Sequence, residues 1–88
     1  MVSRKAGPVR VDAEKNEVAL TVDPRFYSLQ AIRSSAEDFK DCCDVRIRHT
    51  GRMLSVYLKP KAEVDISTLG FEFLNYALGK MRMDDSRF

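Results

Sequence analysis

The chain has 88 residues, the size of one domain, and its 44% hydrophobic and 32% charged residues are typical of a folded globular protein. Fifteen Lys and Arg against thirteen Asp and Glu give a net charge of +2, too small by itself to indicate a nucleic-acid or membrane partner. No apolar run approaches the roughly 18 residues that a membrane-spanning helix needs, and no signal-peptide pattern is present. We therefore expect a cytoplasmic protein with one domain over residues 8–83 and flexible termini at 1–7 and 84–88.

Alternation of apolar and polar residues predicts a β-hairpin at the start of the domain. Val18, Leu20 and Val22 form its second arm, and a shorter first arm contains Val9 and Val11. Asp23-Pro24 ends the second arm, because Pro lacks the N–H that a strand ladder uses.

A helix is predicted next, from a Ser28 cap to about Lys40. Apolar residues at spacings of three and four define its buried stripe: Leu29, Ile32, Ala36 and Phe39. Its opposite face is polar, with Arg33, Glu37 and Lys40 directed at solvent.

A second hairpin is predicted over residues 45–59, after a connection at 41–44. Val45 and Ile47 alternate with arginines, Thr50-Gly51 supplies a turn, and Leu54, Val56 and Leu58 alternate on the return arm. A last helix follows a cap at Asp65 or Ser67, and one of its sides carries Leu69, Phe73, Tyr76, Ala77 and Lys80.

The predicted order is β-α-β-β-α, with an optional extra N-terminal strand. A strand, a helix and a parallel strand form a crossover, and the return arm of the hairpin fills the space between the two strands. We therefore expect an α+β fold in which two helices pack on one face of a three- to four-stranded mixed sheet, as in half of a ferredoxin-like sheet.

The residues that carry chemistry are few. His49 lies at the predicted hairpin turn without an orienting partner, and the strand-to-helix junction at 23–28 has no Gly for a phosphate loop. Adjacent Cys42 and Cys43 do not form a relaxed disulfide, and nearby aspartates disfavour their thiolates. One His and two Cys are too few for a usual zinc or iron–sulfur site.

A cluster of carboxylates lacks the EF-hand pattern and is read as a solvated helix end: Glu37, Asp38, Asp41 and Asp44. We therefore expect no catalytic residue, no metal and no cofactor.

Two surfaces remain as candidates for binding. The first is the sheet face opposite the helices, which would display Arg46, Arg48, Tyr57 and Lys59, with Arg52 and Lys61 at its edges. Such a face would stack a base on Tyr57 and hold phosphates, although sheet-based RNA binders normally use two or three aromatic residues. The modest net charge favours a merely solvated face.

The second surface is on the last helix, whose apolar residues occupy more than one stripe. The spare apolar surface would either complete a small core or serve a partner or a second copy of the chain.

Several landmarks in order resemble the HxsD family: Phe26-Tyr27-Ser28-Leu29 with Ile32, then Phe39, then Leu58-Lys59-Pro60-Lys61, then Phe73-Leu74-Asn75 with Leu78 and Arg82. Members of this family are small accessory proteins encoded with radical-SAM enzymes in His-Xaa-Ser peptide modification systems. The resemblance covers about residues 17–82 and implies that the chain engages a maturase, a precursor peptide, or both. The iron–sulfur and radical chemistry then belongs to the partner enzymes.

The expectation from these observations is a non-catalytic binding subunit. An amide inside an apolar helix is unfavourable unless it makes a polar contact, so Phe71, Asn75, Leu78 and Arg82 are predicted to form one edge of a partner surface. Strand addition of an extended peptide to a free sheet edge is a concrete mechanism. The alternative is a small nucleic-acid-binding module that uses the basic sheet face.

Overall fold

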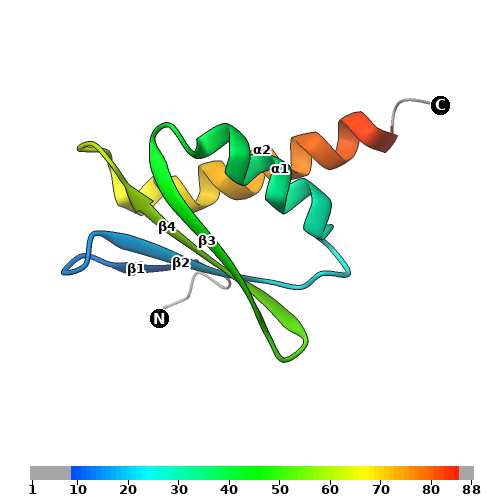
Figure 1. Ribbon diagram of the computed structural model, residues 1–88, viewed down its shortest axis with the longest axis horizontal. Helices are drawn as coiled ribbons and strands as arrows, with labels where there is room; N and C mark the ends of the chain where they lie inside the picture. Colours follow the sequence, from blue (N-terminus) through cyan, green and yellow to red (C-terminus); the bar gives the residue numbers. More distant parts are fainter. Residues whose placement is uncertain (1–8, 86–88) are drawn as a thin grey trace.

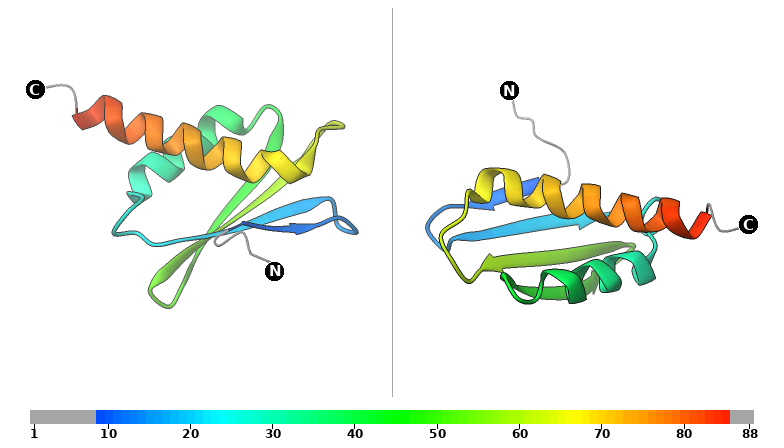
Figure 2. Two further views of the ribbon diagram at one scale, coloured as in Figure 1. Left: turned by 180° about the vertical axis from the view of Figure 1, so that it is seen from behind. Right: turned by 90° about the horizontal axis from the view of Figure 1, so that it is seen from above.

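The computed structural model describes residues 9–85, with side chains for residues 9–82. The elements follow one another as β1 (Val9–Asp12), β2 (Glu17–Val22), α1 (Leu29–Phe39), β3 (Cys43–Thr50), β4 (Met53–Pro60) and α2 (Ile66–Asp85). Both helices cover the same face of the sheet, α2 toward β1 and β2 and α1 toward β3 (Figures 1 and 2). The α+β fold and its extra N-terminal strand are therefore confirmed.

The four strands lie in the order β1-β2-β4-β3, and each neighbouring pair is antiparallel. The prediction of a mixed sheet is wrong in this respect. β2 and β3 do run in the same direction, as the crossover requires, but β4 lies between them, so neither touches a parallel neighbour. β4 thus fills the space between the crossover strands, as expected for half of a ferredoxin-like sheet.

The structure corrects several boundaries. β3 begins at Cys43, within the expected connection, because the backbone N–H of Lys61 donates to the carbonyl oxygen of Cys42 at 2.8 Å and extends the ladder. α2 continues through Asp84 and Asp85, which were expected in the C-terminal tail. The termini expected to be flexible, residues 1–7 and 86–88, lie outside the described residues.

The core lies between the sheet and the two helices. Alternate residues of β2 and β4 are fully or almost fully buried, as predicted: Val18, Leu20, Val22, Leu54, Val56 and Leu58. In α1 the buried residues are Ala31, Ile32 and Ser35, whereas the predicted Leu29, Ala36 and Phe39 are half-buried. α1 faces α2 as well as the sheet, since Phe39 packs edge-on against Phe73 with ring centroids 5.1 Å apart, and this turns the buried stripe.

Local contacts explain where the helices begin. The Ser28 hydroxyl accepts the Ala31 N–H at 3.1 Å, and the Asp65 carboxylate accepts the Ser67 N–H at 3.0 Å, so both helices have the predicted type of cap. The contact to Ser67 lowers the pKa of Asp65. Neither described helix combines the length and the apolar character that a bilayer crossing requires.

Gly70 sets the distance between α2 and the sheet. A Cβ atom at this position would lie 2.9 Å from a methyl group of Val9 and 3.0 Å from methyl groups of Leu20 and Val18. The missing side chain therefore lets the helix backbone approach β1 and β2 closely.

Candidate interaction surfaces

The histidine and the adjacent cysteines lie at opposite ends of β3. His49 is exposed near the end of β3, opposite Leu54. Within residues 9–85 no group of three or more His, Cys, Asp and Glu side chains is placed to hold a metal ion. Cys43 is buried and Cys42 is exposed, and both are free.

The Cys43 thiol is held in its neutral form. Burial, with smaller contributions from Cys42 and Asp44, raises the pKa of Cys43 to about 11. This agrees with the expected suppression of the thiolate, although burial matters more than the like charge of the aspartates. A thiol in this state is a poor nucleophile at neutral pH.

Asp38 joins α1 to α2. Its carboxylate accepts a hydrogen bond from the Tyr76 hydroxyl at 2.6 Å and lies 2.7 Å from the Lys80 ammonium, while the Tyr76 ring packs edge-on against Phe39 with centroids 5.3 Å apart. The hydrogen bonds from Lys80 and Tyr76 lower the pKa of Asp38, and the carboxylate raises the pKa of Tyr76. We call Asp38, Tyr76 and Lys80 the interhelix clamp.

The other carboxylates of the predicted cluster are exposed, as expected, but two of them are paired. Glu37 lies 3.1 Å from the Lys40 ammonium, and Asp44 lies 3.9 Å from that of Lys61. Lys61 also donates to the Lys40 carbonyl oxygen at 2.8 Å. These contacts tie the end of α1 to the start of β3 rather than forming a site for a cation.

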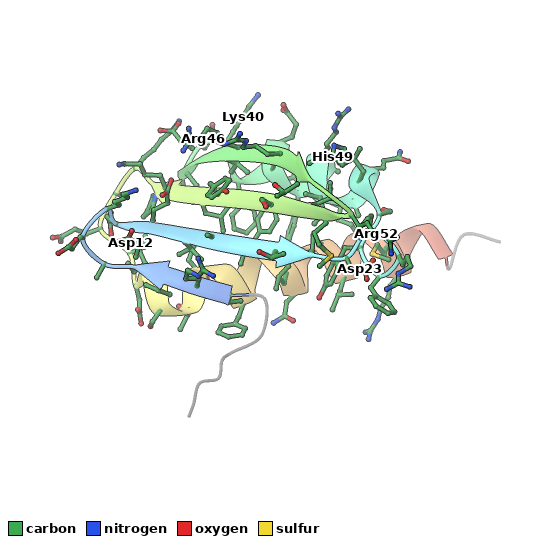
Figure 3. The ribbon with its side chains drawn as sticks, turned by 90° about the horizontal axis from the view of Figure 1, so that it is seen from below. Asp12, Asp23, Lys40, Arg46, His49 and Arg52 are labelled. Atoms are coloured by element: carbon green, nitrogen blue, oxygen red, sulfur yellow. The ribbon has the colours of Figure 1, made fainter. Side chains whose placement is uncertain are left out.

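The open face of the sheet carries the predicted basic residues, because they alternate with the buried ones along β3 and β4. No helix covers this face, and Arg46 lies along its β3 side, with Arg52 toward the far end of the hairpin (Figure 3). Arg46 is already engaged: its guanidinium is 3.4 Å from the Glu17 carboxylate and 5.7 Å from the centre of the Tyr57 ring.

A shallow hollow of about 500 Å³ on this face is lined by both signs of charge, including Glu17 and Asp44 beside Arg46 and Lys59. The face is therefore mixed in charge rather than uniformly basic.

The outer face of α2 carries the four residues predicted to contact a partner. Phe71 has 46% of its surface exposed, Asn75 and Arg82 are exposed, and Leu78 is half-buried. Steps of four, three and four residues place them on one side of the helix. Within the described part of the chain, the Asn75 side chain makes no hydrogen bond. We call this set the α2 outer face.

A third surface contains residues that the sequence did not indicate as part of a binding site. Between α1 and β3 lies a hollow of about 510 Å³, which we call the β3 groove. Val45, Ile47, Ala36 and Cys43 supply its apolar lining, and the rest of the lining is charged: Arg33, Glu37, Lys40, Asp44 and Lys61. The alternation of Val45 and Ile47 predicted a strand, but only the tertiary structure places that strand at an edge with a helix standing off from it.

Comparison of the chain with known protein families, with curated proteins and with solved structures found no match. The resemblance to the HxsD family therefore stays an expectation drawn from the residues themselves.

Proposed function

We propose that this chain is a non-catalytic, cytoplasmic accessory subunit that binds a protein or peptide partner. In the His-Xaa-Ser systems to which its landmarks point, the partner is the radical-SAM maturase or its precursor peptide. The maturase then supplies the reactive groups, and this chain supplies binding surface.

The observation that supports the proposal best is the exposure of Phe71. The opposite side of α2 already completes the core with Leu69, Phe73, Leu74 and Ala77, all buried. Phe71 is therefore not needed for packing, and 46% of its surface stays in contact with water. A large aromatic side chain with a polar neighbour such as Asn75, one helical turn away, is typical of the centre of a protein interface.

A binding assay with a radical-SAM maturase of a His-Xaa-Ser system tests the proposal. Phe71→Ala is expected to raise the dissociation constant by about tenfold, the usual cost of truncating an interface anchor. Asn75→Ala is expected to weaken binding less. Glu72→Ala is the matched control, because Glu72 is exposed on the same helix but outside the α2 outer face.

Unchanged affinity for both variants, with circular dichroism confirming that they are folded, would remove the α2 outer face from the proposal. Binding to an oligonucleotide that weakens steeply with rising salt would favour the alternative, a nucleic-acid-binding module. The open sheet face supports that alternative less well, since Arg46 is committed to Glu17 and Tyr57.

A further inference from the structure

β3 is an edge strand with one side of its backbone unpaired. It pairs with β4 alone among the described strands, over all eight of its residues and without a bulge. Proteins usually protect an edge of this length with Pro, charged side chains, Lys above all, a bulge or an inward-facing charge. β3 has no Pro, Lys or bulge, its charged residues Asp44, Arg46 and Arg48 alternate with the groove-facing positions, and Val45 and Ile47 at those positions are uncharged.

The register identifies which backbone groups are free. A two-residue turn, Gly51-Arg52, joins Thr50 to Met53, and Gly51 has the positive φ of 63° that such a turn requires. The residues flanking a two-residue turn exchange backbone hydrogen bonds, and alternate residues along the strand do the same.

The far end of the hairpin agrees with this assignment. Lys61 donates to Cys42, which belongs to the same alternating set as Thr50, while Pro60, which has no N–H, lies opposite Cys43 in the other set. The N–H and carbonyl groups of Cys43, Val45, Ile47 and His49 therefore point away from the sheet.

The β3 residues whose backbone groups are free also have their side chains on the side of the β3 groove. A strand added along β3 would place every second side chain between β3 and α1, where Ala36, Val45 and Ile47 supply apolar lining. The volume of about 510 Å³ is open to solvent in the unbound chain. The groove thus has room for apolar side chains from an incoming segment.

The charges around the edge favour an acidic ligand. Glu37 is paired with Lys40, Asp44 lies near Lys61, and Glu17 holds Arg46. Arg33, at the rim of the groove, and Arg48, on the open face, have no ion-pair partner among the described residues. Arg33 and Arg48 therefore leave positive charge on both sides of the edge, and Asp41, before the start of β3, is the exposed carboxylate outside these pairs.

We propose that β3 binds an extended peptide segment with alternating apolar and acidic residues by strand addition. The apolar side chains enter the β3 groove, and the acidic ones approach Arg48 on the open face and Arg33 at the rim. This inference rests on the proposed binding function and narrows it to one edge and one class of ligand.

A synthetic peptide of alternating Val and Glu tests the inference, with eight residues to match the length of β3 and both ends capped. We expect saturable binding by calorimetry. The peptide is also made in two methylated forms, each carrying N-methyl groups on one of the two alternating sets of backbone nitrogens. Strand addition requires that one form loses binding and the other keeps it, because only one set of N–H groups faces β3.

Charge variants of the protein locate the peptide. Arg33→Glu and Arg48→Glu are each expected to weaken binding about fivefold, the upper range for one exposed ion pair. Arg52→Glu is the control, because Arg52 is an exposed arginine in the hairpin turn, outside the groove. Phe71→Ala is expected to leave peptide binding unchanged, which separates this inference from the α2 outer face.

Several outcomes would overturn the inference. They are no binding of the peptide, equal binding of its two methylated forms, or a dimer of the free chain that occupies the β3 edge. An oligouridylate that displaces the peptide would point to a nucleic-acid site instead. If the maturase still binds through Phe71 while the peptide does not bind, strand addition alone is wrong and the proposed function stands.

Discussion

The two sides of the helix-covered face differ in how closely the helix approaches the sheet. On the β1 side, α2 packs so tightly that a Cβ on Gly70 would lie 2.9 Å from Val9. On the β3 side, α1 stands off and leaves a hollow of about 510 Å³ above Val45 and Ile47. One edge of the core is therefore closed by packing, and the other has space for side chains that this chain does not supply.

The interhelix clamp accounts for part of this difference. Asp38 holds α1 to α2 through Tyr76 and Lys80, and Phe39 packs against Phe73 and Tyr76. These contacts draw α1 toward α2 rather than down onto β3. The width of the β3 groove thus depends on residues of α2, which are distant from β3 in sequence.

The largest expected loss of stability is at Gly70, where α2 packs closely against β1 and β2. Gly70→Val should lower the free energy of unfolding by about 3 kcal/mol, because its methyl groups must displace those of Val9, Val18 and Leu20. Gly79 is the control in the same helix, since no atom lies within 4 Å of a Cβ placed there. Gly79→Ala should raise the free energy of unfolding by about 1 kcal/mol through helix propensity. Urea unfolding measures both, and similar effects at the two glycines would contradict the close packing at Gly70.

Removing the interhelix clamp should lower the free energy of unfolding by a smaller amount, and this amount should depend on pH. The pKa of Asp38 is lower in the folded chain than its ordinary value of 3.8, so its contribution to stability is complete above that pH and is lost as the pH falls through the folded pKa. Asp38→Asn should therefore be less stable than the parent at pH 7, and the two should converge in acid. Urea unfolding of both proteins from pH 7 to pH 2 measures this. If their free energies of unfolding differed by the same amount at every pH, Asp38 would not stabilise the fold through its charge.

At alkaline pH the free energy of unfolding should fall as the pH rises, the reverse of the trend expected in acid. The pKa of Tyr76 is raised above 10.0 by Asp38, and that of Cys43 is raised from 9.0 to about 11, mainly by burial. The contribution of each group to stability is complete below its ordinary pKa. It is lost as the pH rises through the pKa that the group has in the folded chain. Stability should therefore decline above pH 9.

The smallest expected change in stability is on the open side. Ala36→Leu adds a side chain where the β3 groove has space, so the free energy of unfolding should change by no more than about 0.5 kcal/mol. Affinity for the Val-Glu peptide should fall on the order of tenfold, since Leu occupies the volume of one apolar side chain of the ligand. A large loss of stability would mean that the groove is not free space.

Most of the fold follows from local patterns in the sequence. Alternation identified β2, β3 and β4, Ser28 marked where α1 begins, and Asp65 is one of the two caps predicted for α2. Cys43 and Asp44 were missed as strand residues, because their place in the ladder depends on the contact of Cys42 with Lys61, a residue distant in sequence. Ser35 was missed as a buried residue, because the orientation of α1 depends on packing against α2.

The candidate surfaces were predicted less completely, for the same physical reason. The exposure of Phe71 follows from helical periodicity and was expected. The β3 groove requires knowing that β3 lies at the edge of the sheet and that α1 stands away from it. Pairing of Arg46 with Glu17 likewise joins β3 to β2 across β4, and no local pattern contains it.

Hydrogen exchange of the backbone amides along β3 in the unbound chain tests the free edge most directly. The account predicts slow exchange at Asp44, Arg46 and Arg48, whose N–H groups are bonded to β4, and fast exchange at Val45, Ile47 and His49. Addition of the Val-Glu peptide should then slow Val45 and Ile47. Uniformly slow exchange along β3 in the unbound chain, or no change at Val45 and Ile47 with the peptide at saturation, would contradict the account.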